Sequence, residues 1–184
     1  RITVEPARKA LVVELPARVK IHTLTVEGRP HPIRRKGHEV MVDYAFVAAP
    51  GGDRMTIEIR YEAVFNDPVL DFPVNTDNPG FGVTGVISEK GSFLQAGAGW
   101  YPRIPESRAT FSVEINAPSG TVGVTAGRSL GDETRGGRTF SRWEVRQPVE
   151  GLALSAAGYV VHEKAVGKAT AATYLLPDTV FLSD

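Results

Sequence analysis

The stretch "RMTIEIRYEAVF", residues 54–65, alternates apolar and polar side chains with a period of two. The apolar set is Met55, Ile57, Ile59 and Tyr61, and the polar set is Thr56, Glu58, Arg60 and Glu62. Successive side chains of a β-strand point to opposite faces of its sheet, so this pattern predicts a strand that is buried on one face only. Strands of this kind are typical of antiparallel sheets.

The same alternation continues in both directions along the chain. It recurs in "ALVVELPARVKIHTLTVEG" (10–28), "HEVMVDYAFVA" (38–48), "RATFSVEINAP" (108–118), "TVGVTAG" (121–127), "TFSRWEVRQ" (139–147), "LALSAAGYVVHEK" (152–164) and "KATAATYLL" (168–176). Turn sequences such as "EGRP", "PGGD", "APSG" and "RGGR" separate these segments. The pattern predicts an all-β fold of mostly antiparallel sheets, curved like a saddle or sandwich-like, with about 9–11 or more strands and little or no helix.

Individual core positions follow from the alternation. The expected inward residues are Phe111, Val113 and Ile115 in one strand, and Ile21, Leu24 and Val26 in the second of two strands around Pro16. We expect a single β domain over residues 1–184, with sub-lobes 1–65 and 85–184 joined by an irregular surface loop at 66–84.

Composition excludes several classes of protein. Formal net charge is zero, and no Lys/Arg run exceeds "IRRK" (33–36), so the sequence lacks the basic surface of a nucleic-acid binder. No apolar run reaches the roughly 18 residues that a membrane-spanning helix needs. The chain has no cysteine, which excludes disulfides and thiolate metal sites. It begins at Arg1 and not at methionine, so we expect a piece of a longer protein. The composition leaves the localisation unknown.

No catalytic or metal-binding constellation emerges from the sequence. His31 and His38 flank the basic "PIRRKG" loop, where arginines would oppose a cation, so solvated loop histidines are favoured over a metal site. "HEKAV" (162–166) begins like the zinc motif HExxH, but Val166 replaces the second histidine and the segment follows a strand. No serine lies in a nucleophile elbow. We therefore expect no catalytic residue and no metal ligand in this chain.

One segment breaks the strand pattern. "GSFLQAGAGWYPRIPES" (91–107) combines small residues at 96–99 with the aromatic step Trp100–Tyr101 and a following proline. Small residues let another backbone or a ligand approach closely. Two interpretations remain: a sheet corner in which Trp100 fills the core, which the residues alone favour, and a binding surface.

Several segments together resemble a known family. "SEKGSFLQAGAGWYPRIPES" (88–107), "ATFSVEINAPSGTVGVTAG" (109–127) and "RWEVRQPVEGLALSAAGYVV" (142–161) resemble, in order and strand pattern, the amino-terminal β domain of aminopeptidase N-like zinc metallopeptidases. "ITVEPARKALVVE" (2–14) is similar to the first hairpin of that domain. The resemblance spans most of the chain and implies a saddle-like β domain that packs against a thermolysin-like catalytic domain.

The resemblance also implies where the chemistry lies. The family's GxMEN loop and its zinc-binding HExxH…E helix follow this domain, and neither occurs here. The chain ends where the family crosses into the catalytic domain. We therefore expect an inert domain without a cofactor of its own, zinc in the catalytic domain of the parent protein, and that catalytic domain as its partner on the same polypeptide. Contact with the edge of a peptide substrate is expected as well.

In the family, a glutamine before the aromatic–proline segment lines the substrate pocket near the free amino end of the peptide. The matching residue is Gln95, whose uncharged amide offers a carbonyl acceptor to an ammonium group. Trp100 and Tyr101 are implied as interface or pocket-wall aromatics. Where the family has P-C-x-D-E-P, this chain has "PRIPES" (102–107), which leaves room for a divergent specificity.

Two functions of different classes follow from these observations. The first is a non-catalytic domain of a zinc aminopeptidase-like hydrolase that shapes the substrate cleft and helps to orient the peptide amino terminus. The second is a stand-alone β-sandwich module for binding or adhesion, with an aromatic surface patch at Trp100 and Tyr101. A peptidase domain removed from its partner would expose an apolar docking face, whereas a free-standing module would not.

Overall fold

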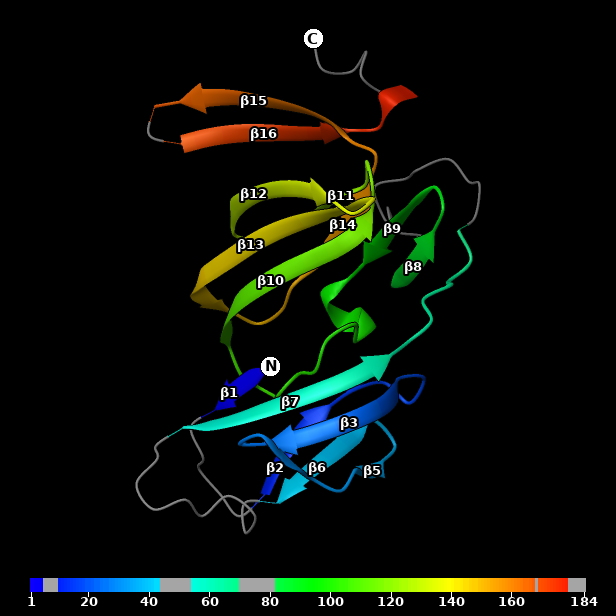
Figure 1. Ribbon diagram of the computed structural model, residues 1–184, viewed down its shortest axis with the longest axis vertical. Helices are drawn as coiled ribbons and strands as arrows, with labels where there is room; N and C mark the ends of the chain where they lie inside the picture. Colours follow the sequence, from blue (N-terminus) through cyan, green and yellow to red (C-terminus); the bar gives the residue numbers. More distant parts are fainter. Residues whose placement is uncertain (5–9, 44–53, 70–81, 168, 179–184) are drawn as a thin grey trace. The chain divides into compact units, whose positions relative to one another are not determined.

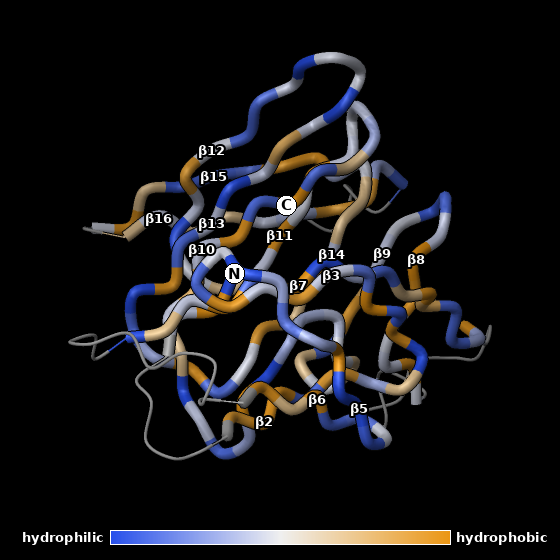
Figure 2. The backbone as a smooth tube through the Cα atoms, turned by 60° about the horizontal axis from the view of Figure 1, so that its bottom comes forward, coloured by the Kyte–Doolittle hydropathy of each residue, from blue (hydrophilic) through white to orange (hydrophobic). Residues whose placement is uncertain are grey.

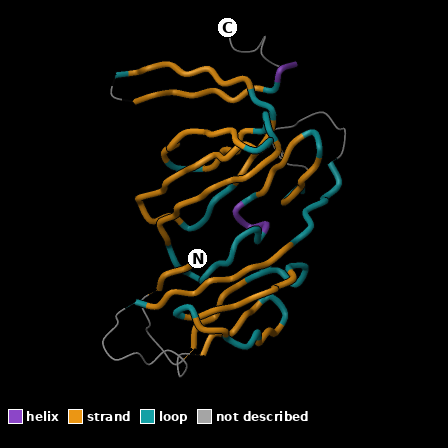
Figure 3. Tube along the Cα trace, in the orientation of Figure 1, coloured by secondary structure: helices purple, strands orange, loops and turns teal. Residues whose placement is uncertain are grey.

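The computed structural model describes residues 1–4, 10–43, 54–69, 82–167 and 169–178. These residues form sixteen β-strands, all paired antiparallel, and include the short 3-10 helix Ala96–Ala98 (Figures 1 and 3). The predicted all-β fold is confirmed. The loop predicted at 66–84 falls largely on residues 70–81, which lie outside the described residues. No helix among the described residues is long and apolar enough to cross a membrane.

The chain divides into two compact units. The first comprises residues 1–65 and 99–107, and the second comprises residues 66–98 and 108–184. The units therefore differ from the predicted sub-lobes, because the segment 99–107 leaves the second half of the sequence and belongs to the first unit.

The first unit contains two antiparallel sheets. One has the order β1 (Ile2–Val4), β7 (Met55–Glu62), β3 (Lys20–Val26), β4 (Arg29–Pro30), and the other β2 (Ala10–Glu14), β6 (Glu39–Asp43), β5 (Arg34–Lys36). Both sheets contribute to one core of buried residues: Val13, Leu15, Val19, Leu24, Val26, Val40, Val42, Met55 and Ile57. Figure 2 shows mainly hydrophobic residues along β2 and hydrophilic residues at β5, the edge strand of the same sheet. The inward set predicted for β7 is confirmed, because Met55 and Ile57 are fully buried and Ile59 and Tyr61 pack against the core.

A β-bulge in β3 explains why apolar residues three positions apart face the same core. The register with β7 shifts between Ile21 and Thr23, so His22 is an extra residue in the strand. In a regular strand, Ile21 and Leu24 would face opposite sides of the sheet. The extra residue restores the alternation, and both side chains contribute to the same core.

The second unit contains a three-stranded sheet, a four-stranded sheet and a hairpin. The first sheet has the order β10 (Ala109–Pro118), β13 (Arg138–Val149), β12 (Arg128–Arg135); the second has β11 (Val122–Thr125), β14 (Leu154–Ala157), β9 (Gly91–Leu94), β8 (Gly85–Ser88); the hairpin is β15 (Val160–Val166) and β16 (Ala169–Leu175). In β10 the predicted inward residues Phe111, Val113 and Ile115 are less exposed than the residues between them, which confirms the alternation.

Gly123 of β11 joins the two sheets of this unit. Its N–H donates to Ser141 Oγ (2.9 Å), and its carbonyl accepts from Trp143 Nε1 (2.9 Å). β11 is an edge strand, so side chains of β13 satisfy backbone groups that no neighbouring strand reaches. The approach is close: a Cβ at Gly123 would lie 2.5 Å from Ile115 Cγ2. Only glycine fits this position without displacing Ile115.

Gly123→Ala is therefore expected to destabilise the protein by about 1–3 kcal/mol, the usual cost of overpacking a core. Gly158→Ala is the matched control, because the nearest atom to its Cβ would be Gly120 O at 3.6 Å, an ordinary contact. Denaturant unfolding of both variants measures the difference. Equal midpoints for the two variants would contradict this account of the sheet contact.

Candidate functional site

Gln95 continues the pairing of β8 and β9 by one residue. Its N–H donates to the carbonyl of Thr84 (2.8 Å), in register with the pair Gly85–Leu94. The chain then turns into the 3-10 helix Ala96–Ala98, and the Gln95 carbonyl accepts from Ala98 N (3.0 Å). The Gln95 backbone is thus held on both sides by hydrogen bonds of the second unit.

The Gln95 side chain has a defined orientation. Its Nε2 donates to the Val83 carbonyl (3.0 Å), and only the nitrogen of the amide can make that bond. The opposite end of the amide is therefore Oε1, which is an acceptor. The side chain is half-buried. This arrangement suits the recognition of an N–H group or an ammonium group of a ligand.

The segment Gly99–Ser107 is attached to the first unit at three points. A Cβ at Gly99 would lie 2.1 Å from Pro16 Cγ, and Gly99 has a φ of +70°, so both space and conformation require glycine. The Trp100 carbonyl accepts from the Tyr61 hydroxyl (2.8 Å). Arg103 and Glu14 exchange two backbone hydrogen bonds, with N···O distances of 2.7 and 3.0 Å. An irregular segment is thereby held in one conformation.

Trp100 and Tyr101 form the expected aromatic step. Their rings contact edge to face, with centroids 4.6 Å apart and an interplanar angle of 72°. Both side chains are half-buried, so Trp100 does not fill the core as the sheet-corner interpretation required. The predicted close approach of a backbone to the small residues is present at Gly99, where Pro16 is the neighbour.

The three predicted site residues belong to two different units of the structure. Trp100 and Tyr101 lie together in the first unit, whereas Gln95 belongs to the second. The predicted roles of Gln95, Trp100 and Tyr101 in substrate binding stay predictions.

Arg35 supports the aromatic segment, a role that the sequence does not predict. Its guanidinium donates to the carbonyls of Leu15 (2.6 Å), Pro16 and Val19 (2.6 Å), and thus holds the turn against which Gly99 packs. The sequence predicts a basic loop at "PIRRKG" (32–37). In the structure Arg35 is half-buried between exposed Arg34 and Lys36, but three consecutive basic residues carry no sequence signal of this difference.

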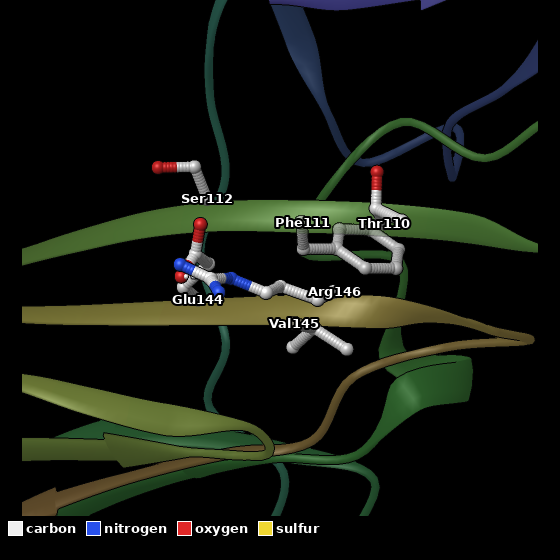
Figure 4. A pocket seen from close by; sticks show the side chains of 6 residues that line it. All are labelled: Thr110, Phe111, Ser112, Glu144, Val145 and Arg146. Atoms are coloured by element: carbon white, nitrogen blue, oxygen red, sulfur yellow. Dashed lines mark hydrogen bonds and ion pairs between the residues drawn. The ribbon is translucent and has the colours of Figure 1, made fainter.

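One pocket of about 320 Å³ lies on the three-stranded sheet of the second unit. Its lining residues are Thr110, Phe111, Ser112, Glu144, Val145 and Arg146 (Figure 4). Arg146 Nε donates to Glu144 Oε2 (2.8 Å), so its two charged side chains neutralise each other. None of the predicted site residues lines this pocket.

The histidines have different surroundings in the described part of the chain. His31 is 6% exposed, and its Nδ1 lies 2.8 Å from the Pro32 carbonyl, so the expectation of a solvated His31 is wrong. Its contact to a backbone carbonyl allows this polar ring to be buried. His38 is exposed as expected. Among the described residues, no group of three or more His, Cys, Asp or Glu side chains could hold a metal ion.

The fold has relatives of known structure. No protein-family model and no curated protein matches the sequence. An M1 zinc metallopeptidase from Deinococcus radiodurans, solved with a Tyr-Ser-Ala substrate, matches 89% of this chain with a TM-score of 0.64 and 18% identity. Aminopeptidase A of Legionella pneumophila, solved with aspartic acid, matches 97% with a TM-score of 0.70 and 14% identity.

This chain spans only 38% of the first relative and 21% of the second. A two-domain M1 zinc metallopeptidase bound to L-arginine gives a similar match, with a TM-score of 0.65 at 17% identity and 38% of its length covered. The predicted resemblance to the amino-terminal β domain of aminopeptidase N-like zinc metallopeptidases is thus confirmed as a resemblance in fold.

The anchor between Tyr61 and Trp100 gives a prediction for alkaline pH. Burial raises the pKa of Tyr61 from 10.0 to about 12. The folded protein therefore favours the neutral phenol, and the resulting stability is fully present below pH 10 and is lost as the pH rises through 12. A two-unit difference corresponds to about 2.7 kcal/mol, which solvent screening of this partly exposed side chain reduces to about 1–2 kcal/mol.

Tyr61→Phe removes both the titration and the hydrogen bond to Trp100. At pH 7 the variant should be less stable than the wild type by about 1 kcal/mol. From pH 10 towards 12 the wild type should lose this advantage, because the variant has no phenol to ionise at this position. Denaturant unfolding at several pH values measures the difference, and other titrating groups cancel between the two proteins. A difference that stays constant with pH would contradict the role assigned to Tyr61.

Proposed function

We propose that this chain is the non-catalytic amino-terminal domain of an aminopeptidase N-like zinc metallopeptidase. Its role is to shape one side of the substrate cleft and to help orient the amino terminus of the peptide through Gln95. The similarity in fold to M1 zinc metallopeptidases over 89–97% of the chain carries this proposal.

The lengths of the relatives support a partner domain on the same polypeptide. A match to nearly the whole of this chain but to 38% or less of each relative is what a single domain of a multidomain peptidase gives. The catalytic domain would hold the zinc ion, which activates water for attack on a peptide bond. The described residues of this chain supply no ligand set for that metal. Their part is confined to binding and orientation.

The chemistry of Gln95 supports the finer role. The free amino end of a peptide is an ammonium group, which needs acceptors and no second positive charge. Gln95 Oε1 is such an acceptor, and the bond from Nε2 to Val83 keeps the amide from turning its NH₂ towards the ligand. A side chain that is already fixed loses little conformational entropy when a ligand binds. Because the group it offers is an acceptor, it favours substrates with a free amino terminus.

The first experiment is to sequence the reading frame beyond Asp184 and to measure the zinc content of the full-length protein. An HExxH motif with a downstream glutamate, together with about one zinc per chain, is the expected result. A continuation without zinc ligands would overturn the peptidase proposal. It would leave the stand-alone binding module, with Trp100 and Tyr101 as its candidate surface.

Gln95→Ala in the full-length enzyme tests the orienting role. We expect kcat/KM for peptides with a free amino terminus to fall about 10- to 100-fold, because a hydrogen bond to a charged group contributes about 1.5–3 kcal/mol. Gln147→Ala is the matched control, since Gln147 is exposed on β13 and lies outside the proposed site. Zinc content should be unchanged in both variants. If the two variants have the same kcat/KM, Gln95 does not orient the substrate.

A further inference from the structure

The four-stranded sheet of the second unit carries an apolar row on one face. Val124 pairs with Ser155, Ser155 with Phe93, and Phe93 with Val86, so these four side chains cross the whole sheet in one line. Residues directly opposite in an antiparallel pair project to the same face. Val122 shares this face because it precedes Val124 by two residues. We call these five residues the Phe93 face.

The Phe93 face is the more exposed side of the sheet, although Ala157, which pairs with Val122 at its end, is buried (5% exposed). The opposite side contains Gly123, which meets Ile115, Ser141 and Trp143 of the other sheet. The next row on that opposite side, Thr125, Leu154, Leu94 and Gly85, is buried in all four strands. In contrast, Phe93 is 39% exposed, and the three valines of the Phe93 face are half-buried.

The three-stranded sheet of the same unit has a solvated face of different composition. There Arg142 pairs with Glu114 (2.8 Å) and Glu133 (3.2 Å), and Arg138 bonds Asn116. A sheet with one face in water carries polar side chains on that face. The Phe93 face carries three valines and a phenylalanine and no charge. Large apolar side chains gathered on an open face mark a surface that another protein surface covers.

The position of Gln95 identifies the occupant. Gln95 continues the β8–β9 register and follows Phe93 by two residues, so its side chain starts from the same face of the sheet. If Gln95 Oε1 faces a substrate held by the catalytic domain, the apolar row beside it lies next to that domain. The surface is uncharged, which fits an apolar protein surface. In the relatives, most of the chain lies outside the part that this chain matches, which is room for such a domain in them.

We propose that the Phe93 face is the docking surface for the catalytic domain of the same polypeptide. This inference rests on the proposed function and adds to it the surface that holds the two domains together. Covering Phe93 and the three valines removes apolar area from water and excludes solvent beside Gln95. The contact thereby fixes Gln95 relative to the substrate.

Cysteine labelling in the full-length protein tests this proposal without depending on peptidase activity. The chain contains no cysteine, so Phe93→Cys introduces a single thiol into this region. Leu130→Cys is the control, because Leu130 is an exposed apolar residue (53%) on β12, in the sheet with the charged face. Alkylation with iodoacetamide is followed by mass spectrometry of the peptide that carries each thiol.

We expect the thiol at position 93 to react at least about tenfold more slowly than the thiol at position 130, and equally fast in urea. Equal rates in the native protein would overturn the proposal. Protection that disappears on dilution would also overturn it, because the occupant would then be a second copy of the chain. Failure of the proposed function is a separate result: a protein without zinc can still show concentration-independent protection at position 93.

Discussion

The turn at Leu15–Val19 is the constraint on which the first unit depends. Leu15 and Val19 are buried in the core, while their carbonyls and that of Pro16 accept from Arg35. One guanidinium with several donors in a plane can serve three carbonyls at once, which lysine could not do with the same geometry. This turn presents Pro16 to Gly99, so a charged side chain of β5 supports the first of the three contacts that hold the 99–107 segment.

In the second unit, the corresponding constraint is a contact between two sheets. Trp143 and Ser141 bond the backbone of Gly123, and this contact fixes β11 against β13. β11 pairs with β14 and β14 with β9, so the chain of pairings leads to Gln95 at the end of β9. The same sheet turns its buried rows to β13 and its Phe93 face outward. The contact at Gly123 thus holds one face of this sheet against β13, and the pairings of the same sheet lead to Gln95.

The low identity to the structural relatives has a physical explanation. TM-scores of 0.64–0.70 accompany identities of 14–18% because a β fold of this kind needs a period of two, turns and a few close contacts more than particular residues. The residues that this fold does require are the small ones at contacts, such as Gly99 and Gly123. Binding residues are less constrained by packing, so the fold leaves them free to diverge.

The sequence by itself determined the antiparallel all-β class, the inward residues of β7 and β10, the small residue at the close approach of Gly99, and the resemblance in fold to a metallopeptidase domain. These features depend on the periodicity of apolar residues and on turn residues, and both can be recognised from residues that are neighbours in the sequence. Only the tertiary structure decided the rest. It placed Arg35 under a turn, enclosed His31, assigned Gln95 and Trp100 to different units, and aligned Val124, Ser155, Phe93 and Val86 in one row. These features arise from strand pairing between distant segments, and no local pattern records which strands will pair.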